Sequence, residues 1–117
     1  MNSSPFDGAW QLITGECIDD GQVLNYDSLE IKSRKVIADG HFTFISYQKG
    51  AFWSAGSGRY RIDGERYIES PDMGTYPPAA LREYVFQARR VGDDWHNERW
   101  ENGVRVEYEL WRRIHDL

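Results

Sequence analysis

The chain has 117 residues and a formal net charge of −5, which allows one domain spanning residues 1–117 to bury its own core. An acidic chain has no basic field to gather phosphates, which argues against a nucleic acid or an anionic membrane as partner. With Cys17 as the only cysteine and no basic and apolar leader in the first residues, we expect a cytoplasmic protein without internal disulfides.

Short runs of β-branched and aromatic residues alternate with turn dipeptides along the chain, and helical periodicity is almost absent. Asp63-Gly64 and Asn102-Gly103 predict type I′ turns, Gly92-Asp93 a type II′ turn and Lys49-Gly50 a weaker one. The expected strands are 8–17, 28–37, 41–48, 51–62, 65–70, 83–91, 94–101 and 104–114. Eight antiparallel strands in this order predict an all-β fold, an up-and-down barrel whose closure removes exposed edges.

Two segments interrupt this pattern. Residues 18–27 form a polar connection after the first strand, and residues 71–82 form a loop with proline and glycine that can hold one helical turn at 77–81. We expect both segments to lie over a mouth of the barrel.

The turn at Asn102-Gly103 predicts which residues of the last hairpin share a face, because paired residues project to the same side of a sheet. The mostly apolar face holds Trp95, Asn97, Arg99, Val104, Val106, Tyr108 and Leu110. The mostly charged face holds His96, Glu98, Trp100, Arg105, Glu107, Glu109 and Trp111. Burying unpaired charges is costly, so we expect the first face inside and the second outside.

The other turns extend the inner face. The turn at Gly92-Asp93 adds Tyr84, Phe86 and Ala88, and the turn at Asp63-Gly64 adds Tyr60, Tyr67 and Glu69. On the first strand, the phase that contains Trp10 also contains Leu12, Thr14 and Glu16, with the tryptophan at one end of the barrel.

Gly8-Ala9-Trp10 at the start of the first strand resembles the Gly-x-Trp signature of lipocalins and the wider calycin superfamily. The segments "KVIADGHFTFIS", "SAGSGRYRIDGERYIE" and "YELWRRI" look like the small bacterial lipocalin-like domains. The resemblance implies an eight-stranded barrel with a small-molecule pocket, in which Trp10 closes the floor beneath a basic residue from the last strand.

Two arginines of the last strand, Arg112 and Arg113, are candidates for that basic residue. Side chains alternate between the two faces along the hairpin, and this parity makes Arg112 the inward one. In the bacterial domains a Trp-x-Arg ending recurs, which matches Trp111 and Arg113. A β-bulge near the end of the strand would reconcile this ending with the parity.

The expected inner face carries polar groups among aromatic rings, which suits a pocket with a few placed polar contacts. The candidate ligand-binding residues are Glu16, Tyr60, Tyr67, Tyr84, Phe86, Trp95, Asn97, Arg99 and Tyr108. Arg99 is the expected anchor for a carboxylate or enolate. Alternatively, the barrel is filled, and Arg99 forms a buried ion pair with Glu69 or Glu16.

Three functions follow as alternatives. The first is binding of a small, partly hydrophobic, anionic molecule inside the barrel. The second is a cofactor-free isomerase, cyclase or lyase, with Glu69 or His41 in proton transfer and Arg99 stabilising negative charge. His41 faces inward if Lys49-Gly50 is a two-residue turn, and is otherwise a surface residue. The sequence has no set of ligands for a metal and implies no cofactor.

The third function is an interaction module. Trp53, Trp100 and Trp111 are expected on outer faces, where large aromatic side chains favour a subunit interface. A homodimer is therefore possible under any of the three functions.

Overall fold

The structure is a computed structural model that describes residues 4–115. The strands are β1 (Gly8–Asp19), β2 (Gln22–Asn25), β3 (Ile31–Ala38), β4 (His41–Gln48), β5 (Ala51–Asp63), β6 (Arg66–Gly74), β7 (Tyr84–Val91), β8 (Asp94–Glu101) and β9 (Val104–Arg113). A short 3-10 helix, η1 (Pro78–Ala80), lies between β6 and β7. The expected domain of 1–117 includes residues 1–3 and 116–117, which lie outside the described residues.

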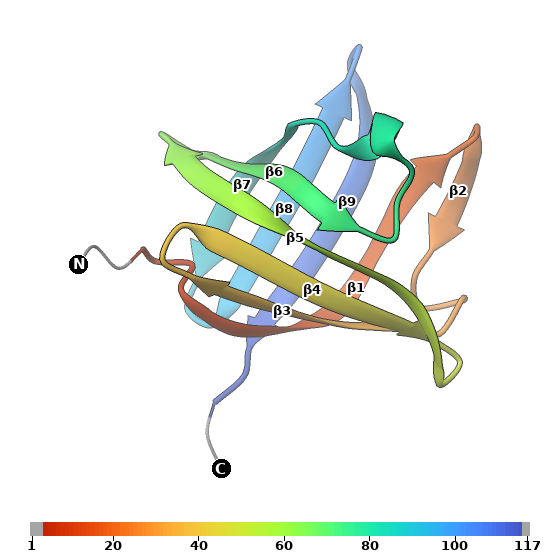
Figure 1. Cartoon of the computed structure of the whole chain (residues 1–117), viewed down its shortest axis with the longest axis horizontal. Helices are drawn as coiled ribbons and strands as arrows, with labels where there is room; N and C mark the ends of the chain where they lie inside the picture. The colour runs from red at the N-terminus through yellow and green to blue at the C-terminus, as the bar shows by residue number, and fades with distance from the viewer. Residues whose placement is uncertain (1–3, 116–117) are drawn as a thin grey trace.

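The sheet closes on itself. Strands β1 and β3 to β9 follow one another in antiparallel order, and β9 pairs back onto β1 (Figure 1). This is the predicted eight-stranded up-and-down barrel. Across residues 4–115, no helix has the length and apolar character needed to cross a membrane.

The segment after the first strand differs from the prediction of a polar connection at 18–27. Strand β1 continues to Asp19 and turns back through Asp20 and Gly21, whose φ angles are 51° and 76°, into β2. Strand β2 pairs with the last four residues of β1, beyond the part of β1 that pairs with β3. The prediction was wrong here because positive φ at Asp20 and Gly21 allows a tight hairpin in a stretch with few β-forming residues.

The predicted turns are largely confirmed. Asn102 and Gly103 both have positive φ, 51° and 77°, as a type I′ turn requires. Lys49 and Gly50 also have positive φ, 51° and 82°. In the β5–β6 hairpin Asp63 pairs with Arg66, so the turn begins one residue later than expected. That change moves the pairing by two residues and therefore leaves the inner face unchanged.

The loop after β6 lies at the same end of the barrel as the β8–β9 turn (Figure 1). The expected helical turn is present as η1. Tyr76 reaches from this loop to the barrel wall, where its hydroxyl lies 3.5 Å from Ser54 Oγ and its ring centre 6.2 Å from that of Phe44. We call this end the mouth and the opposite end the floor.

A β-bulge in β9 overturns part of the predicted facing. Trp100 pairs with Arg105 as expected, but Arg99 pairs with Glu107, so Val106 is an extra residue. Beyond it every side chain changes face. Glu107, Glu109 and Trp111 point into the barrel, and Tyr108 and Leu110 point out, which is the reverse of the prediction for these five residues.

A second bulge has the same effect in β1. Leu12 pairs with Trp111 and Thr14 with Leu110, so Ile13 is the extra residue. The inner face continues through Gly15 and Cys17, while Thr14 and Glu16 point outward. The prediction that placed Thr14 and Glu16 inside was therefore wrong.

The floor is closed by the segment before β1. Phe6 is buried against Tyr67 and Trp95, with ring centres 5.5 and 4.8 Å away. The fully buried Trp10 donates its Nε1–H to Phe6 O at 2.9 Å. This aromatic layer fills the lower end of the barrel.

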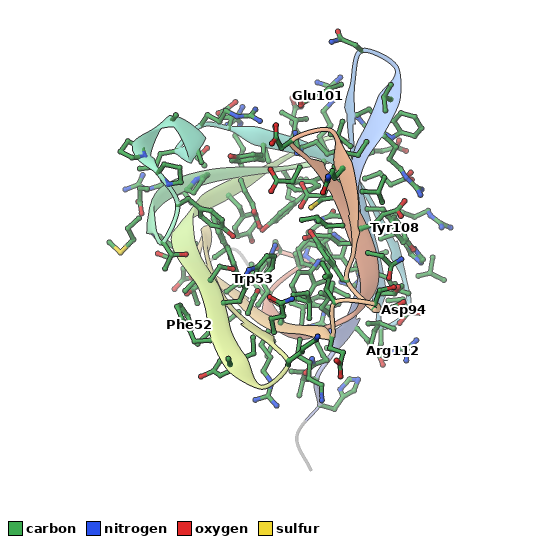
Figure 2. The ribbon with its side chains drawn as sticks, turned by 90° about the vertical axis from the view of Figure 1, so that its right-hand side faces the viewer. Phe52, Trp53, Asp94, Glu101, Tyr108 and Arg112 are labelled. Atoms are coloured by element: carbon green, nitrogen blue, oxygen red, sulfur yellow. The ribbon has the colours of Figure 1, made fainter. Side chains whose placement is uncertain are left out.

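Two guanidinium groups lie over the ring of Trp10, that of Arg113 at 4.4 Å and that of Arg90 at 4.7 Å. Arg113 Nη1 also donates to Asp7 O at 2.6 Å. The floor implied by the resemblance is therefore present, with Arg113 as its basic residue. The prediction of Arg112 was wrong, because the β9 bulge turns Arg112 outward to Asp94, 2.8 Å away (Figure 2).

Candidate ligand site in the barrel interior

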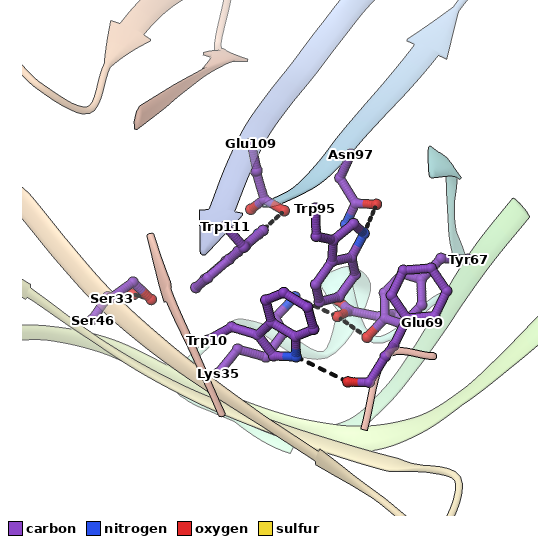
Figure 3. Close-up of polar contacts among 11 residues, drawn as sticks. Trp10, Ser33, Lys35, Ser46, Tyr67, Glu69, Trp95, Asn97, Glu109 and Trp111 are labelled. Carbon is purple, nitrogen blue, oxygen red and sulfur yellow. Dashed lines mark hydrogen bonds and ion pairs between the residues drawn. The ribbon is translucent and has the colours of Figure 1, made fainter. Parts of the chain in front are cut away.

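A buried ion pair lies just above the floor. Lys35 Nζ is 2.6 Å from Glu69 Oε2, and the Tyr67 hydroxyl donates to the same oxygen at 2.7 Å (Figure 3). The two charged side chains are 4% and 10% exposed. The interior partner of Glu69 is thus Lys35, so the alternative in which Arg99 pairs with Glu69 or Glu16 was wrong.

Aromatic rings surround the Lys35 ammonium. The ring centres of Phe42, Tyr67, Trp95 and Trp111 lie 4.9 to 5.8 Å from Nζ. Burial is the largest single influence and lowers the pKa of this ammonium, but the Glu69 carboxylate, together with the charges of Glu109 and Glu107, raises the pKa above its ordinary value. Lys35 therefore stays charged, and it is unsuited to act as a nucleophile or a base.

Asn97 forms the next layer of the interior. Its side chain is fully buried, and its Oδ1 accepts a hydrogen bond of 2.7 Å from Trp95 Nε1 (Figure 3). Within the described residues, its Nδ2 has no hydrogen-bond partner. A buried donor without a partner is uncommon in folded proteins. Asn97 therefore offers a hydrogen bond to any acceptor that enters the barrel.

Strand β9 contributes two carboxylates, Glu109 in the same layer as Asn97 and Glu107 above it. Glu109 pairs across the ladder with Asn97, and its Oε1 accepts a hydrogen bond of 3.1 Å from Trp111 Nε1. Glu107, two residues earlier, accepts from Arg99 Nε at 3.0 Å. Both carboxylates face the interior because of the β9 bulge.

The carboxyl group of Glu107 has a raised pKa. Burial, and next the charge of Glu109, raise the pKa of its carboxyl from 4.5 to about 7, although the Arg99 guanidinium acts in the opposite direction. Its side chain keeps 17% of its surface exposed at the mouth. Glu107 therefore exchanges a proton near neutral pH in a position that solvent reaches.

Arg99 faces inward as predicted, at the mouth. Its Nη1 donates to Glu101 Oε2 at 3.1 Å, in addition to the bond from Nε to Glu107, and its guanidinium lies 5.2 Å from the ring centre of Tyr84. Its side chain is 14% exposed. Both of its bonds go to carboxylates of the protein.

Above the floor, the interior therefore holds more negative than positive charge. Three carboxylates, those of Glu69, Glu107 and Glu109, face two cations, Lys35 and Arg99. With all five groups ionised, the sum is −1. Protonation of the Glu107 carboxylate near neutral pH would bring this sum to zero.

The structure brings together six of the nine predicted ligand-binding residues. Tyr67 and Trp95 lie with the Lys35–Glu69 pair, and Asn97, Arg99 and Tyr84 lie above it. Phe86 is buried in the same core, with its ring centre 6.2 Å from that of Tyr67.

The remaining candidates lie elsewhere. Tyr60 stacks on Tyr67, but its hydroxyl is at the floor, 2.6 Å from Ser4 Oγ. Glu16 and Tyr108 are outside, where Glu16 contacts Arg105 at 3.4 Å and Tyr108 lies on the outer wall (Figure 2). His41 is exposed and contacts its own turn through Asp39 O, so the prediction of an inward His41 was wrong even though Lys49-Gly50 is a two-residue turn.

Sequence reasoning missed Lys35, Glu107 and Glu109. Lys35 shares its phase with Ile37, and parity about Asp39-Gly40 would have paired it with Phe44, as observed. The two glutamates had a signal in the Trp-x-Arg ending, which already required Trp111 to face inward.

Comparison with known proteins supports the fold alone. No protein-family model matches the chain, and no curated protein matches its sequence. An uncharacterized protein from Bacteroides eggerthii DSM 20697 has a similar structure, with a TM-score of 0.58, 17% identity, and coverage of 93% of this chain and 99% of that one. A fatty acid transporter, REP1-NXSQ, gives a TM-score of 0.50 and 11% identity, with coverage of 95% and 97%. Both likenesses fit a calycin-like fold.

Proposed function

We propose that this protein binds a small, partly hydrophobic molecule in the upper interior of the barrel. The observation that carries the proposal is the buried Nδ2 of Asn97, which has no partner among the described residues. Leaving such a donor unbonded costs about 1–3 kcal/mol, and a ligand acceptor would recover that energy. The fold that this chain shares with a fatty acid transporter is compatible with a ligand site in the barrel.

Small side chains form part of the wall across from β8. Ser33, Ser46 and Ser54 are buried inner residues of β3, β4 and β5. Ser46 donates to Ser33 Oγ at 2.8 Å, and Ser33 donates to Ile45 O at 3.2 Å, so both hydroxyl hydrogens are bonded within the fold (Figure 3). The wall they form needs few hydrogen bonds from a ligand, which suits the hydrophobic part of a small molecule.

The charges of the interior favour a neutral ligand over the anionic one expected from Arg99. Arg99 already bonds Glu107 and Glu101, and an anion entering the barrel would meet the carboxylates of Glu107 and Glu109. Bringing like charges together in a buried site is unfavourable. A neutral molecule with a carbonyl or ether oxygen would satisfy Asn97 without that penalty.

Three probes with one apolar body test this proposal: benzamide, benzylamine and benzoate. We expect benzamide to raise the melting temperature of the wild type and benzoate to have no effect. Asn97→Leu should abolish the benzamide effect, whereas Gln87→Leu, the same amide replacement on the exposed face of β7, should retain it. Stabilisation by benzoate alone would instead support the anionic ligand expected from the sequence. No change of melting temperature with any probe would count against a ligand site in the interior.

Glu107 supports a second candidate function, an isomerase, cyclase or lyase that needs no cofactor. A carboxyl group with a pKa of about 7 is matched to proton transfer near neutrality. In this proposal Glu107 replaces Glu69 and His41 as the acid/base group, since Glu69 is engaged by Lys35 and Tyr67 and His41 is outside.

Deuterium exchange at the carbon next to the carbonyl of cyclohexanone is a direct probe of this second function. Glu107→Gln should slow any protein-catalysed exchange by about 100-fold or more. Glu98→Gln, on the outer face of β8, is the matched control. Equal exchange with and without the protein would leave binding as the better proposal.

The expectations about family, oligomeric state, location and domain number stay predictions. We infer membership of the lipocalin-like domains from Gly8-Ala9-Trp10 and the position of Arg113 over Trp10. A homodimer now rests on Trp53 and Trp100, which are 42% and 53% exposed, because Trp111 is buried. The lone Cys17 still favours a cytoplasmic location, and a single domain is still expected.

A further inference from the structure

A groove opens on the outside of the barrel where two strands separate. Strand β1 pairs with β3 only over Gly8–Gln11, and its pairing with β2 begins at Glu16. Figure 1 shows β1 and β3 diverging beyond their paired ends. Between them lies a groove with a volume of about 890 Å³, which also extends over β4 to the turn at Lys49 and Gly50.

Apolar side chains form part of the lining of this groove, beside the polar Gln11 and Ser33. Leu12 and Ile31 come from the inner faces of β1 and β3 and form part of its lining. Ile13, Ile45 and Tyr47 line it from outer faces and are 38%, 43% and 42% exposed. Apolar side chains that line one concave surface at such exposure are a feature of binding sites.

The rim of the groove is basic. Lys32, Arg34 and Lys49 line it together with one acidic residue, Glu30. Among residues 4–115, no carboxylate lies within ion-pair distance of any of these three cations. Arg34 makes one side-chain bond, from Nε to Gln11 Oε1 at 3.3 Å, which leaves the end of its guanidinium available.

This arrangement is set apart by the shared groove, because Arg59, Arg66 and Arg89 also have no carboxylate partner among residues 4–115 but do not line it. The chain carries a net charge of −5, and most other bonded arginines have carboxylate partners, such as Arg105 with Glu98. Three cations without such partners around one groove therefore create a local site for a negative group.

We propose that this groove is a second binding site, distinct from the site around Asn97 although Ser33 belongs to both linings, for a small amphiphile with an apolar chain and a single anionic head. The apolar chain would lie on Ile13, Ile45 and Tyr47, and the head would lie among Lys32, Arg34 and Lys49. The volume is in the range of sites for small molecules, about 300–1,000 Å³, which favours a free amphiphile over a protein partner. The proposal does not depend on the function proposed for the interior.

The test compares decanoate, decanol and decylamine, which share one alkyl chain and differ in head group. Binding is followed by amide chemical shifts in NMR spectra, at concentrations below micelle formation. We expect decanoate to shift the resonances of residues 11–13, 31–34 and 45–50. Decanol should bind more weakly at the same residues, and decylamine should bind least.

A triple variant tests the basic rim. Lys32→Gln, Arg34→Gln and Lys49→Gln together should weaken decanoate binding by about tenfold and leave decanol within about twofold, since exposed charge pairs contribute modestly. Arg59→Gln, Arg66→Gln and Arg89→Gln remove the same charge from exposed positions elsewhere and should leave both affinities unchanged. Asn97→Leu, which alters the interior site, should also have no effect on the groove.

Several results would overturn this proposal. Chemical shift changes confined to the barrel interior would show that decanoate does not bind in the groove. Equal binding of decanoate and decylamine would show that the basic rim does not select the head group. Binding to vesicles with anionic lipids but not to monomeric decanoate would indicate a membrane-docking surface instead. A dimer that buries residues 45–52 would show that a second copy covers the groove.

Discussion

The two halves of the barrel interior use the same strands for different purposes. At the floor, the cations Arg90 and Arg113 lie against Trp10 and backbone carbonyls. In the upper half, strand β9 supplies carboxylates in place of cations, and Asn97 has a donor without a partner. At the floor, Trp10 and Arg113 donate to backbone carbonyls and Arg90 Nε alone has no partner among residues 4–115, whereas the upper half combines the unpartnered Asn97 amide with the two carboxylates of β9. The difference indicates that the floor stabilises the barrel and the upper half carries recognition.

The largest expected effect concerns the ion pair at the boundary between the halves. Lys35→Met should lower the free energy of unfolding by roughly 3–5 kcal/mol, because it leaves the Glu69 carboxylate buried without its cation. Urea unfolding at neutral pH measures this change. The double variant Lys35→Met/Glu69→Gln should recover part of the loss, and a single variant as stable as the wild type would show that the pair is not structural.

The next effect concerns Glu107 and the pH dependence of stability. Its folded pKa of about 7 lies above the ordinary 4.5, so between these values the folded protein binds a proton more tightly than the unfolded chain. This contribution is fully present below pH 4.5 and is lost as the pH rises through 7. It amounts to about 3 kcal/mol, from roughly 1.4 kcal/mol for each unit of pKa.

Glu107→Gln should therefore flatten the decline in stability between pH 5 and 8. Unfolding curves at several pH values, with Glu98→Gln as the outer-face control, measure the slope of each protein. An identical slope in Glu107→Gln and wild type would mean that another group titrates. The pKa of Glu107 itself can be followed by NMR of its carboxyl carbon.

Sequence predicted the strands closely, because turn dipeptides and alternating side chains are local signals. Parity also placed Arg99 and Asn97 correctly, since no irregularity separates them from the turn at Gly92-Asp93. It failed for Glu107 and Glu16 because each lies beyond a bulge, and one extra residue reverses every later side chain.

The burial cost of charge was also a poor guide in this hairpin. It predicted that the face with Glu107 and Glu109 lies outside, yet both carboxylates are inside. Arg99 bonds Glu107 and the Trp111 indole bonds Glu109, so each has a donor within the barrel. A cation from β3, Lys35, adds positive charge that no local pattern of β9 could reveal.

A smaller effect separates the two arginines at the end of β9. Arg113→Met should lower stability by about 2 kcal/mol, because it removes a cation–π contact with Trp10 and a hydrogen bond to Asp7 O. Arg112→Met removes only an exposed pair with Asp94 and should change stability by about 0.5 kcal/mol or less. Thermal unfolding of the two variants compares them directly. The reverse order would restore Arg112 as the residue over the floor.

The smallest effect tests the bulge in β1. Glu16→Gln should change stability by no more than about 0.5 kcal/mol, because Glu16 lies outside and its contact with Arg105 at 3.4 Å joins side chains that are 41% and 38% exposed. The same substitution at Glu107 changes the pH dependence of stability, so the pair of variants compares one chemical change on the two faces of the barrel. Urea unfolding at pH 5 and pH 8 measures both. A loss of several kcal/mol for Glu16→Gln would place Glu16 inside and contradict the facing that the bulge creates.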